Sequence, residues 1–239
     1  MKETFNNVHE MQEVIRERGF LPFFAGEIPS FSIEEFCPDE LWFADDQEGP
    51  WEWKSQAIVE GDLAYGKFFR GKAGFISMEW FPDFVNYRRS IIQLTPQEEQ
   101  MLAVIQQHQS LLSREVKRLC GYTRPRRPRI TNPIERMMAQ EAQHTSKRTH
   151  SSRESYETAI TRLQMATRIV TADFEYSVNK QGRRYGWSIA RYCTPEDFFG
   201  AERLQVPRTP QESLDRLMEH LLSILPHSTP DEVQHALLG

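Results

Sequence analysis

Three helix starts are marked clearly in this sequence. A threonine followed by proline, with glutamate three positions after the threonine, occurs at Thr95, Thr209 and Thr229. In such a tetrad the threonine side chain accepts a hydrogen bond from a free amide of the first turn, and the glutamate reaches back to the amide of the threonine. Ser32 has the same spacing from its glutamate, and Gly19 is placed to end a helix over residues 8–18. The chain is therefore expected to be helix-rich.

The composition is that of a globular protein with a sizeable core, since 39% of the 239 residues are hydrophobic and 26% are charged. No apolar run approaches the roughly 20 residues that cross a bilayer, and the N-terminal sequence has no apolar signal segment, so we expect no membrane association. Cys37, Cys120 and Cys193 are isolated thiols, which suits the cytoplasm. Nucleotide-binding, zinc-protease and hydrolase motifs are missing, so no metal or cofactor is expected.

Charge is distributed unevenly along the chain. The net charge is −5, but residues 122–153 carry +6, which leaves −11 for the remainder. The proline-rich stretch TRPRRPRITNP within this segment cannot be helical throughout. We interpret residues 121–152 as a basic insertion that folds along a phosphate backbone on binding; the alternative is a solvated insertion.

Residues 95–199 predict three helices followed by a hairpin. One helix follows Thr95, a short one is capped by Ser113 and ends at Gly121, and a third covers residues 155–168. Alternation over residues 170–178 then predicts a half-buried strand, with a turn at 179–182 and a second strand over 184–192. This is the order of a winged helix, in which the third helix enters the major groove and the hairpin lies against the backbone or minor groove.

The third helix separates into two faces at 100° per residue. Its core face is expected to contain Tyr156, Ala159, Ile160, Leu163 and Thr167. The residues expected to contact double-stranded DNA are Thr158, Thr161, Arg162 and Arg168 on this helix and Lys180, Arg183 and Arg184 at the hairpin tip. Cations at the tip suit phosphate contacts, which give affinity without reading sequence.

The N-terminal part is rich in aromatic residues between Trp42 and Arg89, a density typical of a packed core. Arg70 and Gly71 are expected to close a short hairpin, followed by a helix from about Met78. We therefore predict an α+β, helix-rich fold with a domain over 1–92, a winged helix over 93–200 and a C-terminal helical pair over 201–239.

Two blocks of sequence resemble bacterial proteins grouped as AlkZ-related. They are WEWK at 51–54 leading to AYGKFFRGKAGFISMEWFPDFVNYRR, and LQM at 163–165 leading through ADFEYSVNKQGRRYGWSIARYCTPEDFFG. AlkZ itself is a DNA glycosylase that excises alkylated bases and unhooks interstrand crosslinks, and its family is built from tandem winged helices. The resemblance implies DNA repair, and a second, degenerate winged helix in the N-terminal half. The Gln-x-Gln motif that those glycosylases carry near the start of the chain has no counterpart in this N-terminal region.

A monofunctional glycosylase needs a polar group for water, a stacking surface for the extruded base and cations for the backbone. Glu52 lies between Trp51 and Trp53, where desolvation by the indoles is expected to raise its pKa toward that of a general base, and Glu79 is the alternative. The two tryptophans are candidates for stacking on a base. Candidate phosphate contacts in this part are Lys54, Lys67, Lys72, Arg88 and Arg89. The opposing interpretation of Glu52 is a carboxylate at a helix N-terminus.

Three functions remain open on the sequence. The first is a DNA-binding winged-helix protein that acts as a glycosylase on alkylated or crosslinked bases. The second is a non-enzymatic transcription regulator that reads a site with Thr158, Thr161 and Arg162. The third is a protein-interaction scaffold, which the acidity of the remainder and the aromatic residues would suit.

Overall fold

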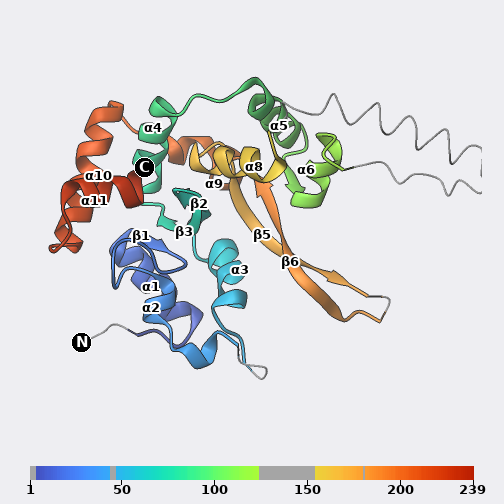
Figure 1. The fold of residues 1–239 in the computed structure, drawn as a ribbon, viewed down its shortest axis with the longest axis horizontal. Helices are drawn as coiled ribbons and strands as arrows, with labels where there is room; N and C mark the ends of the chain where they lie inside the picture. The colour runs from blue at the N-terminus through green and yellow to red at the C-terminus, as the bar shows by residue number, and fades with distance from the viewer. Residues whose placement is uncertain (1–3, 44–46, 124–153, 180) are drawn as a thin grey trace, which may run out of the picture.

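The computed structural model describes residues 4–43, 47–123, 154–179 and 181–239. Helices and two small antiparallel sheets alternate along these residues, which confirms the α+β, helix-rich class (Figure 1). The basic insertion, apart from residues 121–123, and Lys180 lie outside the described residues. None of the helices in the described part is both long and apolar enough to cross a membrane.

The first half of the chain follows the expected local signals. Gly19 ends the first helix with a φ of 76°, and the Ser32 side chain caps the second. The hairpin turns at Arg70 and Gly71, and the helix expected from Met78 begins at Phe81 because residues 78–80 form a turn. The elements are α1 Val8–Arg18, β1 Phe20–Pro22, α2 Ile33–Phe36, a 3₁₀ helix Asp39–Leu41, α3 Pro50–Glu60, β2 Leu63–Phe69, β3 Lys72–Ser77 and α4 Phe81–Ile91.

The rest of the chain confirms the three capping tetrads, because Thr95, Thr209 and Thr229 each begin a helix with reciprocal hydrogen bonds to their glutamates. The expectation that Ser113 caps a helix is wrong. Ser113 is the first helical residue, and its hydroxyl is hydrogen-bonded to that of Tyr156 at 2.9 Å. The elements are α5 Pro96–Gln107, β4 Ser110–Leu112, α6 Ser113–Leu119, α8 Tyr156–Met165, β5 Val170–Val178, β6 Arg184–Cys193, α9 Pro195–Phe199, a 3₁₀ helix Ala201–Leu204, α10 Pro210–Ile224, α11 Pro230–Val233 and a π-helix Gln234–Leu238.

The two halves repeat one arrangement. Among the described elements, and apart from the 3₁₀ helix Asp39–Leu41, each runs helix, strand, helix, helix and hairpin. The sheets have the equivalent orders β1-β3-β2 and β4-β6-β5. Left-handed residues recur at equivalent places: Gly19 and Gln109 directly precede β1 and β4, with φ of 76° and 60°. Asp62 and Thr167 follow the ends of α3 and α8, with φ of 54° and 52°. Because left-handed non-glycine residues are uncommon, their recurrence indicates a true structural repeat.

The halves pack reciprocally, since α3 lies against β5 and α8 lies against β2. The Lys67 amide donates to Gln164 Oε1 at 3.1 Å, and Lys67 Nζ donates to the Thr161 hydroxyl at 3.4 Å. At the other contact, the Ser55 hydroxyl donates to Asp173. Each third helix is thus placed against the hairpin of the opposite half.

Two hydrophobic cores form beneath these sheets. The larger core contains most of the aromatic residues of the first half and is completed by α10 and the C-terminal π-helix, through residues such as Leu217 and Leu238. The smaller core lies in the second half, where Tyr156, Ala159, Ile160 and Leu163 form the inward face of α8, as predicted from periodicity. The C-terminal helices therefore pack on the first half, although they follow the second in sequence.

A buried carboxylate joins α10 to α4. Asp83 is 1% exposed and pairs with Arg208 at 2.8 Å and with Arg216 at 2.6 Å, while the Ser213 hydroxyl donates to it at 2.7 Å. Burial raises the pKa of Asp83, but the hydrogen bonds from Arg208 and Ser213 and the two positive charges outweigh burial and hold the pKa below its ordinary value.

We expect Asp83→Asn to lower the free energy of unfolding at pH 7 by about 2 kcal/mol, because two partly exposed guanidinium groups lose their buried partner. Since the pKa of Asp83 is lower in the folded chain, this contribution is complete above about pH 4 and is lost as the pH falls through the folded pKa. Urea denaturation of both proteins across pH 3 to 7 measures it. Asp215→Asn, an exposed change on α10, is the matched control; equal effects of the two changes would contradict the prediction.

Candidate nucleic-acid interface

A groove of about 520 Å³ separates α3 from the β5–β6 hairpin. Aromatic rings of Trp51, Phe174 and Tyr176 line it together with the hydroxyls of Ser55 and Ser188. Its charged lining consists of Glu48, Glu52, Glu60, Asp173 and Glu175, with Arg184 as the one cation among the lining residues. The groove is therefore aromatic and acidic, which favours a flat, electron-poor or cationic group over a phosphate.

Two carboxylates of the groove are held in place by hydrogen bonds. Glu52 accepts the amide of Gly49 at 3.1 Å, so it serves as the carboxylate at the N-terminus of α3. Asp173 accepts the Ser55 hydroxyl and the Phe174 amide on one oxygen. Within the described residues, the second oxygen of Glu52 and that of Asp173 have no hydrogen-bond partner, so both can accept one from a bound group.

Lys54 lies behind the aromatic wall of the groove and is 7% exposed. Its Nζ is 4.2 Å from the centroid of the Phe174 ring and 4.6 Å from that of Trp51. Burial lowers the pKa of Lys54 to about 8, although the charge of Glu52 opposes this shift. Lys54 thus stabilises the rings that line the groove, rather than standing as a free surface cation.

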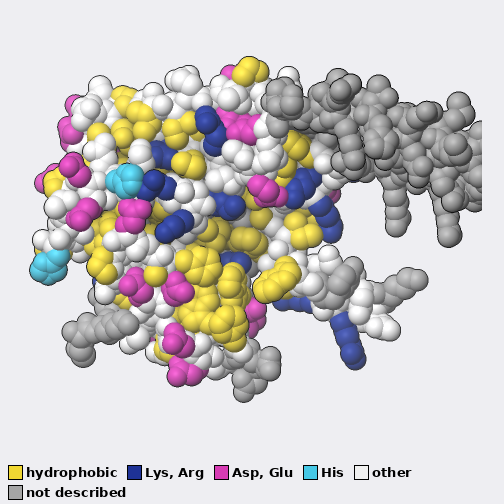
Figure 2. Space-filling view, viewed as in Figure 1, with side chains coloured by type: hydrophobic (Ala, Val, Ile, Leu, Met, Phe, Trp, Pro, Cys, Tyr) yellow, Lys and Arg dark blue, Asp and Glu magenta, His cyan; other side chains and the backbone are white. Residues whose placement is uncertain are grey.

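The β5–β6 hairpin projects from the body of the molecule beyond α3 (Figure 1). Arg183 and Arg184 are exposed near its tip, and neither forms an ion pair with any residue that the structure describes. The Arg184 guanidinium lies 5.2 Å from the Tyr176 ring, and the indole of Trp187 is 85% exposed. Figure 2 shows hydrophobic side chains gathered over the region of α3, with basic side chains on the neighbouring hairpin.

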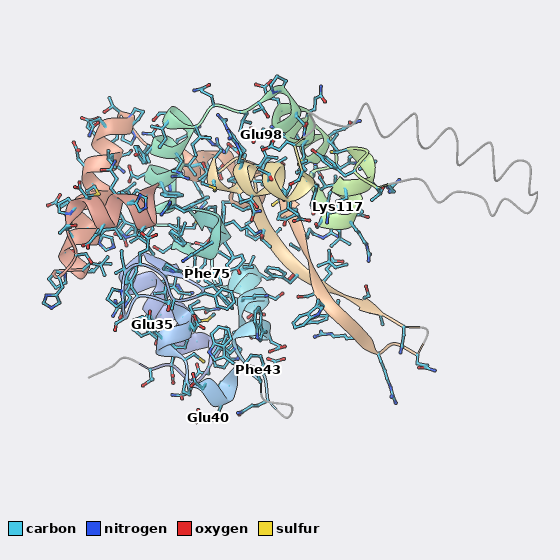
Figure 3. All side chains as sticks on the ribbon, in the orientation of Figure 1. Glu35, Glu40, Phe43, Phe75, Glu98 and Lys117 are labelled. Atoms are coloured by element: carbon cyan, nitrogen blue, oxygen red, sulfur yellow. The ribbon has the colours of Figure 1, made fainter. Side chains whose placement is uncertain are left out.

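The outward face of α8 is largely engaged by other parts of the chain. Arg162 forms an ion pair of 2.6 Å with Glu98, whose side chain is fully buried at the start of α5 (Figure 3). Thr161 is in contact with Lys67, and half-buried Arg168 has its pKa lowered by burial and by the nearby charge of Arg89. Thr158, at the first turn of the helix, is exposed.

The remaining candidate residues lie apart from the groove. Trp53 is 4% exposed on the core side of α3, and exposed Glu79 lies 3.9 Å from Arg216. Lys72 is exposed at the start of β3, and Lys67 is half-buried against α8.

Arg88 and Arg89 point inward at the end of α4. Arg88 is 1% exposed and its Nε donates to the carbonyl of Met165 at 2.8 Å. Arg89 donates to the carbonyl of Thr167 at 2.9 Å and pairs with Glu196 at 2.5 Å. These two arginines therefore satisfy carbonyl groups at the C-terminal end of α8.

Most residues that line the groove, among them Asp173 and Ser55, were not predicted as site residues from the sequence, nor was Trp187 at the rim. The alternation of apolar and polar residues over 170–178 placed Asp173 on the solvent side of a strand. A carboxylate is common there and gave no sign of a site. A signal for Trp187 was present in Gly186, because a glycine inside a strand pattern indicates a bulge. The described part of the chain contains no cluster of histidine, cysteine, aspartate or glutamate side chains that could hold a metal ion.

Fold and site together define a protein of two repeated helix-and-hairpin units, with a groove where one unit meets the hairpin of the other. The family model described as AlkZ related matches residues 5–238, and the chain belongs to this family. No curated protein and no solved structure matches the chain.

The pKa of Lys54 can be tested directly. We expect its side chain to titrate near pH 8 in the folded protein, because the buried ammonium group is poorly hydrated. The unfolded chain keeps this proton to about pH 10.4, so stability should rise with pH between these two values. Heteronuclear NMR of lysine Nζ groups measures the midpoint, and Lys54→Met assigns the resonance. A midpoint near pH 10.4 would contradict the prediction, as would an equal rise in stability in Lys54→Met.

Proposed function

We propose that this protein binds damaged double-stranded DNA through tandem winged helices and acts as a DNA glycosylase-like repair protein. The observation that carries the proposal is the projecting β5–β6 hairpin, whose cations Arg183 and Arg184 lie next to an aromatic, acidic groove. Membership of the AlkZ-related family supports the same direction. The hairpin supplies affinity for the backbone, and the groove supplies a place for a base.

Tandem winged helices account for the repeated order of elements. We assign residues 1–92 and 93–200 to the two winged-helix units and residues 201–239 to a helical extension. In the common binding mode of this architecture the third helix enters the major groove. Because Arg162 is paired with buried Glu98 and Thr161 contacts Lys67, we propose that the β5–β6 hairpin makes the principal DNA contact here.

The groove suits an extruded base better than it suits the backbone. Carboxylates repel phosphates but attract a purine that carries positive charge after alkylation. The rings of Trp51 and Tyr176 offer stacking surfaces. Glu52 and Asp173 each have an oxygen without a partner among the described residues, which can accept a hydrogen bond from the base edge or from water. Attack of such a water on C1′ would break the N-glycosidic bond and release the base, with the carboxylate taking the proton of the water.

Binding is tested with the hairpin cations. Changing both Arg183 and Arg184 to Ala should weaken binding to duplex DNA by about tenfold at moderate salt and reduce the salt slope by about two, since each arginine contacts one phosphate. Fluorescence anisotropy at several salt concentrations measures both quantities. Arg203→Ala removes a cation that is already paired with Asp62 at 2.6 Å, and it should leave both unchanged. An unchanged affinity in the double variant means that the hairpin does not contact phosphates.

Base release is tested separately on duplexes that contain N7- or N3-alkylated purines. The wild-type chain should release the free base, and Glu52→Gln or Asp173→Asn should slow release at least tenfold while binding is retained. Glu79→Gln, which changes a carboxylate outside the groove, is the matched control. If the chain binds these duplexes but releases no base, glycosylase activity is excluded. If it protects one discrete DNA sequence, a transcription regulator is favoured.

A further inference from the structure

Trp187, in strand β6 of the hairpin, exposes 85% of its surface. An indole normally buries most of its area, because transfer of its apolar surface out of water is favourable. The two tryptophans of α3 follow this rule, since Trp53 is 4% exposed and Trp51 is half-buried. Most of the Trp187 indole is therefore available for contact with a partner of the hairpin.

The backbone around Trp187 is shaped to present it. Glu175 pairs with Ile189 and Ser177 pairs with Tyr185, so β6 contains extra residues between these two pairs and forms a β-bulge. Gly186 lies in this bulge with a φ of 72°, and a Cβ added there would meet nothing within 4 Å. The glycine is thus needed for its backbone conformation rather than for space. Bulges often re-aim a side chain next to a functional site, and Trp187 lies within this one.

The exposed indole stands at the rim of the groove. Its ring centroid lies 6.5 Å from that of Trp51, with the planes at 68° in an edge contact. The adjacent residue Ser188 and the nearby Arg184 both line the groove. A DNA strand held by the hairpin cations would therefore meet Trp187 directly beside the space in which a base can be accepted.

We propose that Trp187 is a wedge that enters the base stack of duplex DNA and fills the gap left when a base moves into the groove. This inference rests on the proposed function, because it needs the hairpin to hold DNA. An aromatic side chain inserted between base steps replaces part of the lost stacking and keeps the duplex open. The flanking cations make a polyanion with flat bases the fitting partner, since an apolar protein surface would leave Arg183 and Arg184 unpaired.

The wedge can be detected with 2-aminopurine as one base of a mismatched pair in a duplex. The fluorescence of 2-aminopurine rises when this base leaves the stack. We expect the wild-type chain to raise this fluorescence severalfold at saturation. Trp187→Ala should abolish the rise and weaken binding to the mismatched duplex by about tenfold, whereas Trp187→Phe should retain most of both. Phe43→Ala is the matched control, because Phe43 is also 85% exposed but belongs to the segment after the 3₁₀ helix Asp39–Leu41 (Figure 3).

The outcomes separate the wedge from the proposed function. If Trp187→Ala binds DNA and raises the fluorescence as the wild-type chain does, the wedge is refuted and DNA binding stands. If Phe43→Ala has the same effect as Trp187→Ala, general loss of surface aromatics explains the result and the wedge is again refuted. If the wild-type chain does not bind duplex DNA at any salt concentration, the proposed function fails and the wedge fails with it.

Discussion

The placement of the two halves depends on two consecutive arginines at the end of α4. Arg88 and Arg89 donate to the carbonyls of Met165 and Thr167, where α8 ends and its unpaired carbonyls concentrate partial negative charge. Arg88 is buried and also donates to the carbonyl of Leu238 near the end of the chain. One side chain thereby joins α4, α8 and the C-terminal helix. Because β5 follows α8 directly, these arginine contacts also set the position of the β5–β6 hairpin relative to α3. They thereby set the width of the groove between the hairpin and α3.

Equivalent hairpins have different surroundings in the two halves. The β2–β3 hairpin is short, and its strand β2 lies against α8, where Lys67 contacts Thr161 and Gln164. The β5–β6 hairpin is longer and extends beyond its contact with α3, so that its outer part is free (Figure 1). The same architecture therefore supplies one hairpin for internal packing and one whose outer part is exposed. The acidic groove lies between this hairpin and α3, where its carboxylates disfavour a phosphate.

Local signals explain why much of the fold could be predicted from the sequence. Capping of the helices after Thr95 and Thr209 depends on residues within one turn, and the inward face of α8 follows from its period. The outer face of α8 could not be predicted in the same way, because the partners of Gln164 and Thr161 on β2 are 97 and 94 positions away. The exposure of Trp187 escaped prediction because a bulge interrupts the alternation of its strand. Trp51 and Trp53 lie on the same helix, but Trp53 is buried in the hydrophobic core and Trp51 is half-buried at its edge. The direction of that core from α3 depends on residues distant in the sequence.

The reciprocal packing of α3 on β5 and α8 on β2 has the form of an isologous dimer joined into a single polypeptide. In a true homodimer both hairpins would have to be identical. A substitution that released one hairpin from its packing would therefore release the other and weaken the interface. Covalent fusion removes this constraint. One copy can keep the side chains that hold the pair together, and the other can lengthen its hairpin, acquire a bulge at Gly186 and expose an indole without loosening the interface.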